Sequence, residues 1–342
     1  MDRFSIASFN LYNLQLPGQR MNPGQKPWTK REFERKVSWT AEQINSLKPD
    51  IVGLQELWHR DAMGEVLDRH ALADRYELLA EPADGDRIIC GALVRKGMRR
   101  GDPEWIDHFP DAVRLESRNS LDLQAPEISV AISRFSRPVL RFQVALRDES
   151  PLAEVFVAHL KSKLPTRIDQ EVWFKDSPET YKEHATALGG ALSTIRRTAE
   201  AAALRVLLTG VMKGTATPVI VLGDINDGQH SNTANILTEQ PRYLVGDSQG
   251  GADVGLYTAQ TLQEYRDTRD VYYTHVHNDL RESLDHVLVS EQLYDHSRRR
   301  LWLFDGLIIN NDHLNEDDHR GTGTGDHGLV CVSFKYRPLE SN

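Results

Sequence analysis

Short apolar runs flanked by polar residues are the feature that most constrains the fold of this 342-residue chain. Each run is three to six residues long and rich in β-branched side chains, which is typical of buried strands. No apolar stretch approaches the ~20 residues that a membrane-spanning helix needs, so we expect no transmembrane segment. The runs that we interpret as strands are residues 4–9, 51–54, 155–158, 219–222, 287–289 and 329–334.

Two longer segments have the periodicity of amphipathic helices. Between residues 30 and 47 the apolar side chains fall on one helical face, and Pro49 ends the pattern. Residues 179–213 are rich in Ala, Leu, Glu and Arg and predict the longest helix, with a kink at the Gly189–Gly190 pair. Residues 160–180 contain two prolines and predict a loop. Strand-sized runs mixed with such helices indicate a mixed α and β fold.

Polar side chains stand where these predicted strands end or begin. Each of the first four runs is followed by one, whereas the last two runs are preceded by one. If the last two strands run antiparallel to the first four, all of these side chains meet at one edge of the sheets. A cut anywhere between residues 60 and 280 would divide the group, so we expect residues 1–342 to form a single domain. The group consists of Asn10, Glu56, His159, Asp224, Asn226, Asp285, Asp326 and His327.

The composition of this group points to the hydrolysis of a phosphate ester. Carboxylate oxygens suit a hard cation such as Mg²⁺, whereas zinc prefers sulfur and nitrogen. Such a cation neutralises phosphate oxygens, and a histidine paired to a carboxylate can move the proton that activates water. The formal net charge of −9 argues against a broad basic face for nucleic acid. It does not exclude a nuclease, because a bound cation reverses the local field.

Six motifs in this order resemble the endonuclease/exonuclease/phosphatase superfamily, the DNase I-like metal-dependent phosphoesterases. The resemblance covers nearly the whole chain, and the run HLKSK at 159–163, with the insertion after it, is most similar to the bacterial nuclease-like branch. It implies a four-layered α/β/β/α sandwich, in which two packed mixed β-sheets are flanked by helices, and a Mg²⁺ or Mn²⁺ site at one edge. The motifs are SFN at 8–10, PDIVGLQE at 49–56, HLKS at 159–162, GDIN at 223–226, LDHVLV at 284–289 and GDH at 325–327.

The same resemblance implies a role for each residue of the metal site and its histidine. Glu56 would be the principal metal ligand, assisted by Asn10 and Asp326. His327, oriented by Asp285, would activate water or stabilise the phosphoryl group, and the resemblance leaves open which of the two it does.

The remaining motif residues are expected to contact the substrate. Asp224 and Asn226 would position the nucleophile or the scissile phosphate, and Asp224 would also protonate the leaving oxygen. His159 would contact the phosphate or act as the acid, and Lys161 would place a positive charge on the substrate phosphate.

Two positions depart from the family pattern. Many members have Arg two residues before the aspartate of the fifth motif, where this chain has Ser283, so one phosphate contact is in doubt. Repair-type members have Asp where this chain has Tyr12, which makes abasic-site repair a less favoured activity.

We therefore expect a Mg²⁺-dependent nuclease that hydrolyses DNA or RNA by in-line attack of a metal-assisted water, with nucleic acid as its substrate. The same site would serve a phosphatase or phosphodiesterase acting on small or lipid phosphate esters, such as sphingomyelin, phosphoinositides or nucleotides, which is the alternative. A catalytically silent binding module is disfavoured, because all the motif residues are present. The N-terminus lacks the pattern of a secretory signal, so we expect a cytoplasmic monomer that does not insert into membranes.

Three further features carry expectations that the structure can test. Trp28, Trp58 and Trp173 lie near predicted loops at the proposed edge and are candidates for stacking on bases. The acidic and histidine-rich tract at 312–319 predicts a solvated surface loop. Cys90 and Cys331 lie in apolar runs and predict buried free thiols.

Overall fold

Two six-stranded mixed β-sheets packed face to face form the centre of the computed structural model, which describes residues 1–82, 84–118, 127–239, 254–267 and 272–339. The first sheet has the order β15 (Trp302–Asn310), β16 (Leu329–Tyr336), β1 (Arg3–Leu14), β2 (Ile51–His59), β4 (Asp84–Arg95) and β3 (Tyr76–Ala80). The second has the order β11 (Tyr257–Thr258), β14 (Asp285–Val289), β10 (Val219–Asp224), β9 (Ala153–His159), β8 (Arg134–Val144) and β5 (Arg99–His108).

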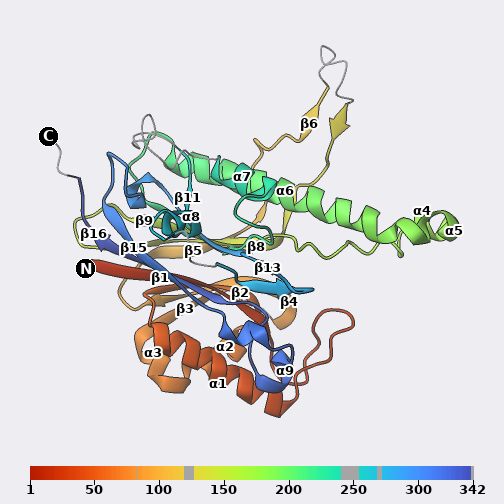
Figure 1. Cartoon of the computed structure of the whole chain (residues 1–342), viewed down its shortest axis with the longest axis horizontal. Helices are drawn as coiled ribbons and strands as arrows, with labels where there is room; N and C mark the ends of the chain where they lie inside the picture. The colour runs from red at the N-terminus through yellow and green to blue at the C-terminus, as the bar shows by residue number, and fades with distance from the viewer. Residues whose placement is uncertain (83, 119–126, 240–253, 268–271, 340–342) are drawn as a thin grey trace.

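Helices cover the outer face of each sheet, so the molecule has four layers (Figure 1). The expected α/β/β/α sandwich is therefore confirmed. Below the first sheet in the view lie α1 (Lys30–Leu47), α2 (Arg60–Leu67), α3 (Leu72–Arg75) and α9 (His319–Thr322). Above the second lie α6 (Ala185–Met212) and α7 (Asn232–Thr238), whereas α8 (Ala259–Glu264) packs against β14 and β15.

Smaller elements extend from this sandwich. The hairpin β12 (His275–His277) with β13 (Leu280–Glu282) and the pair β6 (Glu116–Ser117) with β7 (Ile128–Ser129) form two-stranded sheets. Short helices α4 (Val172–Asp176) and α5 (Pro178–Tyr181) precede α6. The 3₁₀ turns are η1 (Arg69–Ala71), η2 (Lys182–His184), η3 (Glu291–Leu293) and η4 (Asp312–Asn315).

Strand direction agrees with the prediction that brought the polar side chains to one edge. β1 runs parallel to β2, and β10 runs parallel to β9. The later strands are reversed, because β16 is antiparallel to β1 and β14 is antiparallel to β10. All six predicted strands are present, and the predicted helix at residues 30–47 has the observed bounds of α1.

The two sheets pack closely at Gly53, three residues before Glu56. An apolar core fills the space between them, with Val157 and Leu222 of the second sheet among its fully buried members. Gly53 of β2 faces these side chains, and a Cβ atom there would lie 2.8 Å from the Cβ of Leu222. A side chain at Gly53 would push the sheets apart, so glycine is needed for this contact.

The helical region before β10 differs from the prediction in two ways. α6 begins at Ala185 rather than at residue 179, and the short helices α4 and α5 begin at Val172, inside the predicted loop of residues 160–180. α6 also continues without a kink through Gly189, where a Cβ would lie 2.4 Å from the carbonyl oxygen of Thr166. That glycine therefore permits close packing of the 160–170 segment on the helix, rather than a bend. Among the described residues, no helix is both long enough and apolar enough to cross a membrane.

An ion pair joins the first helix to the segment that precedes the last predicted motif. Thr29 caps α1 in a capping box with Glu32, whose carboxylate also accepts two hydrogen bonds from Arg320 of α9, both of 3.0 Å. The hydrogen bonds from Arg320 and Thr29 lower the pKa of Glu32 to about 2. Glu32 thus helps to hold α9 against α1. Its partner Arg320 lies six residues before Asp326 in the chain.

We expect Glu32→Gln to lower the free energy of unfolding at pH 7 by about 1 kcal/mol, the magnitude of a partly exposed ion pair after solvent screening. Because the folded-state pKa is depressed, this contribution is present above the usual glutamate pKa and is lost as the pH falls toward 2. Urea unfolding at several pH values measures the difference. Glu34→Gln, in an exposed pair with Arg69, is the control. A difference that stays constant down to pH 2 contradicts the prediction.

Candidate active site

The ends of the central strands bring the predicted polar side chains together. In the second sheet, Asp224 of β10 is paired with His159 on one side and with Asp285 on the other. Asn10 of β1 reaches across from the first sheet, where its Nδ2 atom donates a hydrogen bond of 3.1 Å to Asp224 Oδ2. Side chains far apart in sequence therefore share one edge, as predicted.

His327 is held by a buried carboxylate. Its Nδ1 atom donates a hydrogen bond of 2.7 Å to Asp285 Oδ2, and Asp285 is fully buried. The Nε2 atom of His327 lies 3.9 Å from Asp224 Oδ2. Burial alone would lower the pKa of His327, but the charges of Asp285 and Asp224 raise it well above its usual value. The imidazole is therefore a cation at neutral pH in the absence of other ligands.

Asp224 contacts more of the motif residues than its neighbours in the site do. Its Oδ1 atom accepts a hydrogen bond of 2.8 Å from the backbone N–H of Asn226, and its Oδ2 atom lies 3.6 Å from His159 Nε2. Burial raises the pKa of Asp224 to about 7, against the lowering effect of the His327 charge. A carboxyl group with a pKa in this range can both take and give a proton near neutral pH.

The next two motif residues complete the second-sheet side of the site. His159 is buried, and burial followed by the charge of Arg137 lowers its pKa well below the usual value, so its imidazole is neutral. Asn226 adopts a left-handed φ of 55°, and its Nδ2 atom donates a hydrogen bond of 3.0 Å to the carbonyl of Leu160. This bond ties the loop after β10 to the end of β9.

Glu56 and Asp326 form an acidic pair on the first-sheet side. Burial and the charge of Asp326 raise the pKa of Glu56. Glu56 has a φ of 57°, a strained value for this residue type. The Oδ1 atom of Asp326 is buried without a hydrogen-bond partner among the described residues. Two neighbouring carboxylates with an unsatisfied oxygen fit the donor chemistry of Mg²⁺ or Mn²⁺.

Asn13 supports Glu56 and was not identified from the sequence. Its backbone N–H donates a hydrogen bond of 2.9 Å to Glu56 Oε2. The indole N–H groups of Trp28 and Trp58 donate to the backbone and side-chain oxygens of Asn13, at 2.8 and 2.9 Å. Both indoles are buried, so the prediction that they stack on bases was wrong. Trp173 of α4 is exposed, and its role stays a prediction.

Lys36 is a second residue that the sequence analysis missed. It is fully buried on α1, with its Nζ atom 5.2 Å from the ring centre of Tyr12 and 5.8 Å from that of Trp28. Burial lowers its pKa to about 8, against the charges of Asp326 and Glu56. Lys36 lies next to the apolar face of the helix predicted at residues 30–47, and this position could have been noticed in the sequence. A lysine is rarely fully buried unless it is paired, so a lysine at such a position indicates a nearby acidic group.

Arg137 of β8 is a third residue that the sequence analysis missed, and the second cation among them. One guanidinium nitrogen donates a hydrogen bond of 3.1 Å to the carbonyl of Leu160. Its charge contributes to the lowered pKa values of His159 and Lys161 and partly offsets the raised pKa of Glu56. Within the described ranges, no carboxylate forms an ion pair with it. Arg137 thus supplies a cation at the end of β9 that the motifs did not predict.

Lys161 follows β9 directly but its ammonium group is turned toward its own loop. The Nζ atom donates to the carbonyls of Ser162 and Leu164, at 3.4 and 3.2 Å. Burial and the neighbouring Arg137 lower its pKa. Its contact with substrate phosphate stays a prediction.

The acidic residues of the 312–319 tract are exposed, as predicted, whereas its two histidines are partly buried. His313 of η4 is half-buried and its ring packs edge-on against Trp39, with ring centres 4.8 Å apart. Its Nε2 atom donates a hydrogen bond of 2.9 Å to the carbonyl of His327. The tract therefore helps to hold the backbone of the last motif. Both cysteines are buried and free, as predicted.

In the part of the chain that the structure describes, two groups of side chains have the spacing of a metal site. Each group places three donor atoms within 4.8 Å of one another. One group is Asp224, Asp285 and His327, and the other is His275, Asp326 and His327. His275, from the β12–β13 hairpin, was not identified from the sequence.

Comparisons with known proteins agree with this geometry. A profile described as the Endonuclease/Exonuclease/phosphatase family matches residues 7–327. A search of curated proteins gives no match. Among solved structures, D. rerio TDP2 complexed with single strand DNA product has a TM-score of 0.53 at 17% identity, and the match covers 98% of this chain and 100% of that chain.

Two further solved structures have the same fold. The human Nocturnin catalytic domain with bound sulfate anion has a TM-score of 0.54 at 14% identity, with 98% of this chain and 95% of that chain covered. An endonuclease/exonuclease/phosphatase family protein from Bacteroides thetaiotaomicron has a TM-score of 0.55 at 12% identity, with 99% of each chain covered. The expected DNase I-like fold is confirmed by these likenesses.

We expect Glu56→Gln to raise the melting temperature in EDTA by a few degrees. Because burial and Asp326 raise the pKa of Glu56, its ionised form destabilises the folded state at neutral pH, and the neutral amide removes that cost. Mg²⁺ should stabilise the wild type but not the variant, since a ligand of the native state raises stability by mass action. Scanning calorimetry with and without Mg²⁺ measures both effects.

The control for this experiment is Glu65→Gln, at an exposed position of α2. Its melting temperature and its response to Mg²⁺ should match those of the wild type. A Glu56→Gln protein that melts lower in EDTA, or that is stabilised by Mg²⁺ as strongly as the wild type, contradicts the assignment of the acidic pair.

Proposed function

The chain belongs to the endonuclease/exonuclease/phosphatase family, and on that premise we propose that it is a divalent-metal-dependent nuclease that hydrolyses phosphodiester bonds of DNA or RNA. The observation that carries the proposal is the Asp285–His327 pair beside Asp224, on the same sheet edge as the acidic pair of Glu56 and Asp326. The single-strand DNA product held by D. rerio TDP2, a protein of the same fold, supports nucleic acid as the substrate class.

Glu56, Asp326 and Asn10 would hold the cation, with Mg²⁺ as the natural ion and Mn²⁺ able to replace it. When bound, the cation neutralises phosphate oxygens and stabilises negative charge on the leaving oxygen. Asn10 would offer its Oδ1 atom, because its Nδ2 atom already donates to Asp224. The backbone N–H of Asn13 and the buried Lys36 keep the two carboxylates in place.

The protonation states of three groups indicate their roles. The raised pKa of His327 favours the imidazolium form, which stabilises the phosphoryl group rather than acting as the base. The carboxyl of Asp224, with a pKa of about 7, can take a proton from the attacking water. His159 is neutral, so it is suited to donate a hydrogen bond to a phosphate oxygen rather than to act as an acid.

Asp285 acts through His327. Its carboxylate accepts the Nδ1 proton and so fixes the ring with Nε2 directed toward Asp224 and the reacting group. Asn226 holds Asp224 by a backbone hydrogen bond and would help to position the scissile phosphate. Arg137, together with Lys161, would contact the flanking phosphate of the substrate.

Cleavage assays test the proposal. We expect the purified protein to cut plasmid DNA, single-stranded DNA or RNA with Mg²⁺ and not with EDTA. Glu56→Ala and His327→Ala should each reduce turnover by ~100-fold or more, since a metal ligand or a charge-stabilising group is removed. Wild-type turnover in either variant would mean that the roles are wrong.

The same assay separates the alternative substrate class. Metal-dependent hydrolysis of a chromogenic phosphodiester, with no cleavage of any polymer, would favour small or lipid phosphate esters. The absence of any metal-dependent hydrolysis would favour a silent binding module.

Replacement of Arg137 tests the unpredicted phosphate contact. We expect Arg137→Gln to raise KM by about 10-fold with a smaller change in kcat, because a contact to a non-reacting phosphate contributes mainly to binding. Steady-state kinetics with a short oligonucleotide measures the split. Arg134→Gln, an exposed arginine of the same strand that pairs with Asp107, is the matched control. An unchanged KM in Arg137→Gln would place the guanidinium outside the substrate path.

A further inference from the structure

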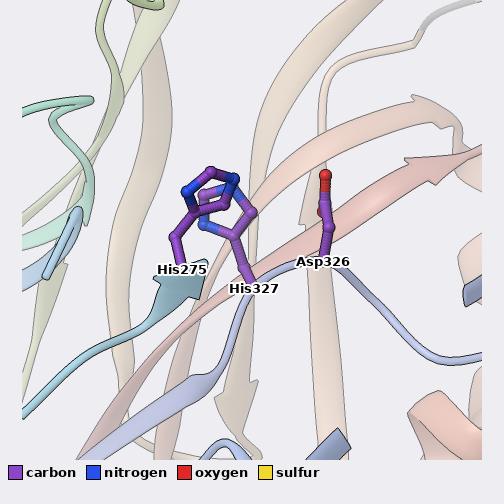
Figure 2. A group of neighbouring side chains, drawn as sticks. All are labelled: His275, Asp326 and His327. Carbon is purple, nitrogen blue, oxygen red and sulfur yellow. The ribbon is translucent and has the colours of Figure 1, made fainter. Parts of the chain in front are cut away.

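The β12–β13 hairpin places His275 beside the last motif. Backbone pairing fixes this arrangement, because His275 forms an isolated antiparallel bridge with His327. The N–H of Gly328 also donates a hydrogen bond of 2.7 Å to the carbonyl of Thr274. The two imidazole rings lie with their centres 4.8 Å apart and their planes tilted by 44°. Figure 2 shows both rings and the carboxylate of Asp326 on the same side of the loop that carries Asp326 and His327.

Unsatisfied donor atoms converge in this group. The Nδ1 atom of His275 and the Oδ1 atom of Asp326 are both buried without a hydrogen-bond partner among the described residues. His327 donates its Nδ1 proton to Asp285, and release of the Nε2 proton to solvent on metal binding would make Nε2 the ligating atom. Buried polar atoms usually have partners, so two that lack one, in residues that can offer ligand atoms within 4.8 Å of each other, indicate a missing ligand.

We propose that His275, Asp326 and His327 bind a transition-metal dication of the Zn²⁺ class, at a site that shares Asp326 with the Mg²⁺ position at Glu56 and Asn10 and excludes Mg²⁺ when it is filled. Two imidazole nitrogens and one carboxylate oxygen are a donor set that Zn²⁺ prefers, whereas Mg²⁺ prefers oxygen alone. The three donor atoms lie within 4.8 Å of one another, and bonds of about 2.1 Å close that spacing with small rotations of the side chains. A solvent molecule would complete a tetrahedral site.

The hydrogen bond from His327 to Asp285 supports this assignment. Histidine ligands of metals commonly donate their second N–H to a carboxylate, which fixes the ring and the tautomer. The overlapping group of Asp224, Asp285 and His327 is less suited, because three of its four carboxylate oxygens already accept hydrogen bonds or lie against His327. His275 is therefore the residue that distinguishes the proposed site.

Occupation of this site would suppress hydrolysis. Zn²⁺ would take Asp326 away from the Mg²⁺ position and would occupy the Nε2 atom of His327 that faces Asp224. This consequence rests on the proposed nuclease function, whereas metal binding itself does not. Mg²⁺ would therefore support hydrolysis, and Zn²⁺ would inhibit it.

Calorimetric titration with Zn²⁺ alone and with Mg²⁺ alone tests the binding. We expect His275→Asn to weaken the tightest Zn²⁺ site by about 10-fold or more, as the loss of a ligand should, while Mg²⁺ binding stays within about 2-fold. His277→Asn is the matched control, since His277 lies two residues away in β12 and is exposed. It should bind Zn²⁺ as the wild type does. Equal Zn²⁺ affinity in His275→Asn and the wild type would overturn the proposal.

A wild-type crystal soaked in Zn²⁺ provides a test that needs no variant. An anomalous peak between His275, Asp326 and His327 supports the site, and peaks only elsewhere overturn it. In the cleavage assay, Zn²⁺ should inhibit the Mg²⁺-supported reaction of the wild type about 10-fold more strongly than that of His275→Gln. If no hydrolysis is found, the nuclease proposal fails, and the titration and the crystal still decide the metal site.

Discussion

The hydrogen bond between Asn10 and Asp224 joins the ends of the two sheets, and the rest of the site depends on it. The sheets come close enough for this bond because Gly53 leaves room for Leu222 between them. The pairing within the second sheet then sets His159 and Asp285 on either side of Asp224. The positions of these polar side chains are thus set by strand pairing more than by loops, because the register of each strand fixes where its polar residue lies.

Burying so many acids in one place is costly unless cations accompany them. His327 supplies one charge beside Asp285 and Asp224, and Arg137 and Lys36 supply others nearby. On the first-sheet side the compensation is incomplete. The carboxylates of Glu56 and Asp326 repel each other there, and a bound divalent cation would offset that repulsion. Such sites trade stability for function.

Much of this arrangement could be predicted from single residues at the ends of apolar runs. The six strands, their relative directions and helix α1 were predicted, because burial of alternate or continuous apolar side chains leaves a local pattern. Lys36, Arg137 and His275 were missed, since each reaches the site from a strand, helix or hairpin that carries no motif. Trp28 and Trp58 were wrongly predicted to stack on bases, because whether an indole is exposed depends on tertiary packing and not on its neighbours in the sequence.

The sequence by itself determined the strand-sized runs and the polar groups at their ends, because these follow from local periodicity. The order of the six motifs gave the family resemblance, and that resemblance implied the layered fold. Only the tertiary structure decided which groups are neutral, which are charged and which lack a partner. Those properties depend on burial and on distances between strands far apart in the chain. The orphaned nitrogen of His275 beside Asp326 is such a property, since no spacing in the sequence relates the two residues.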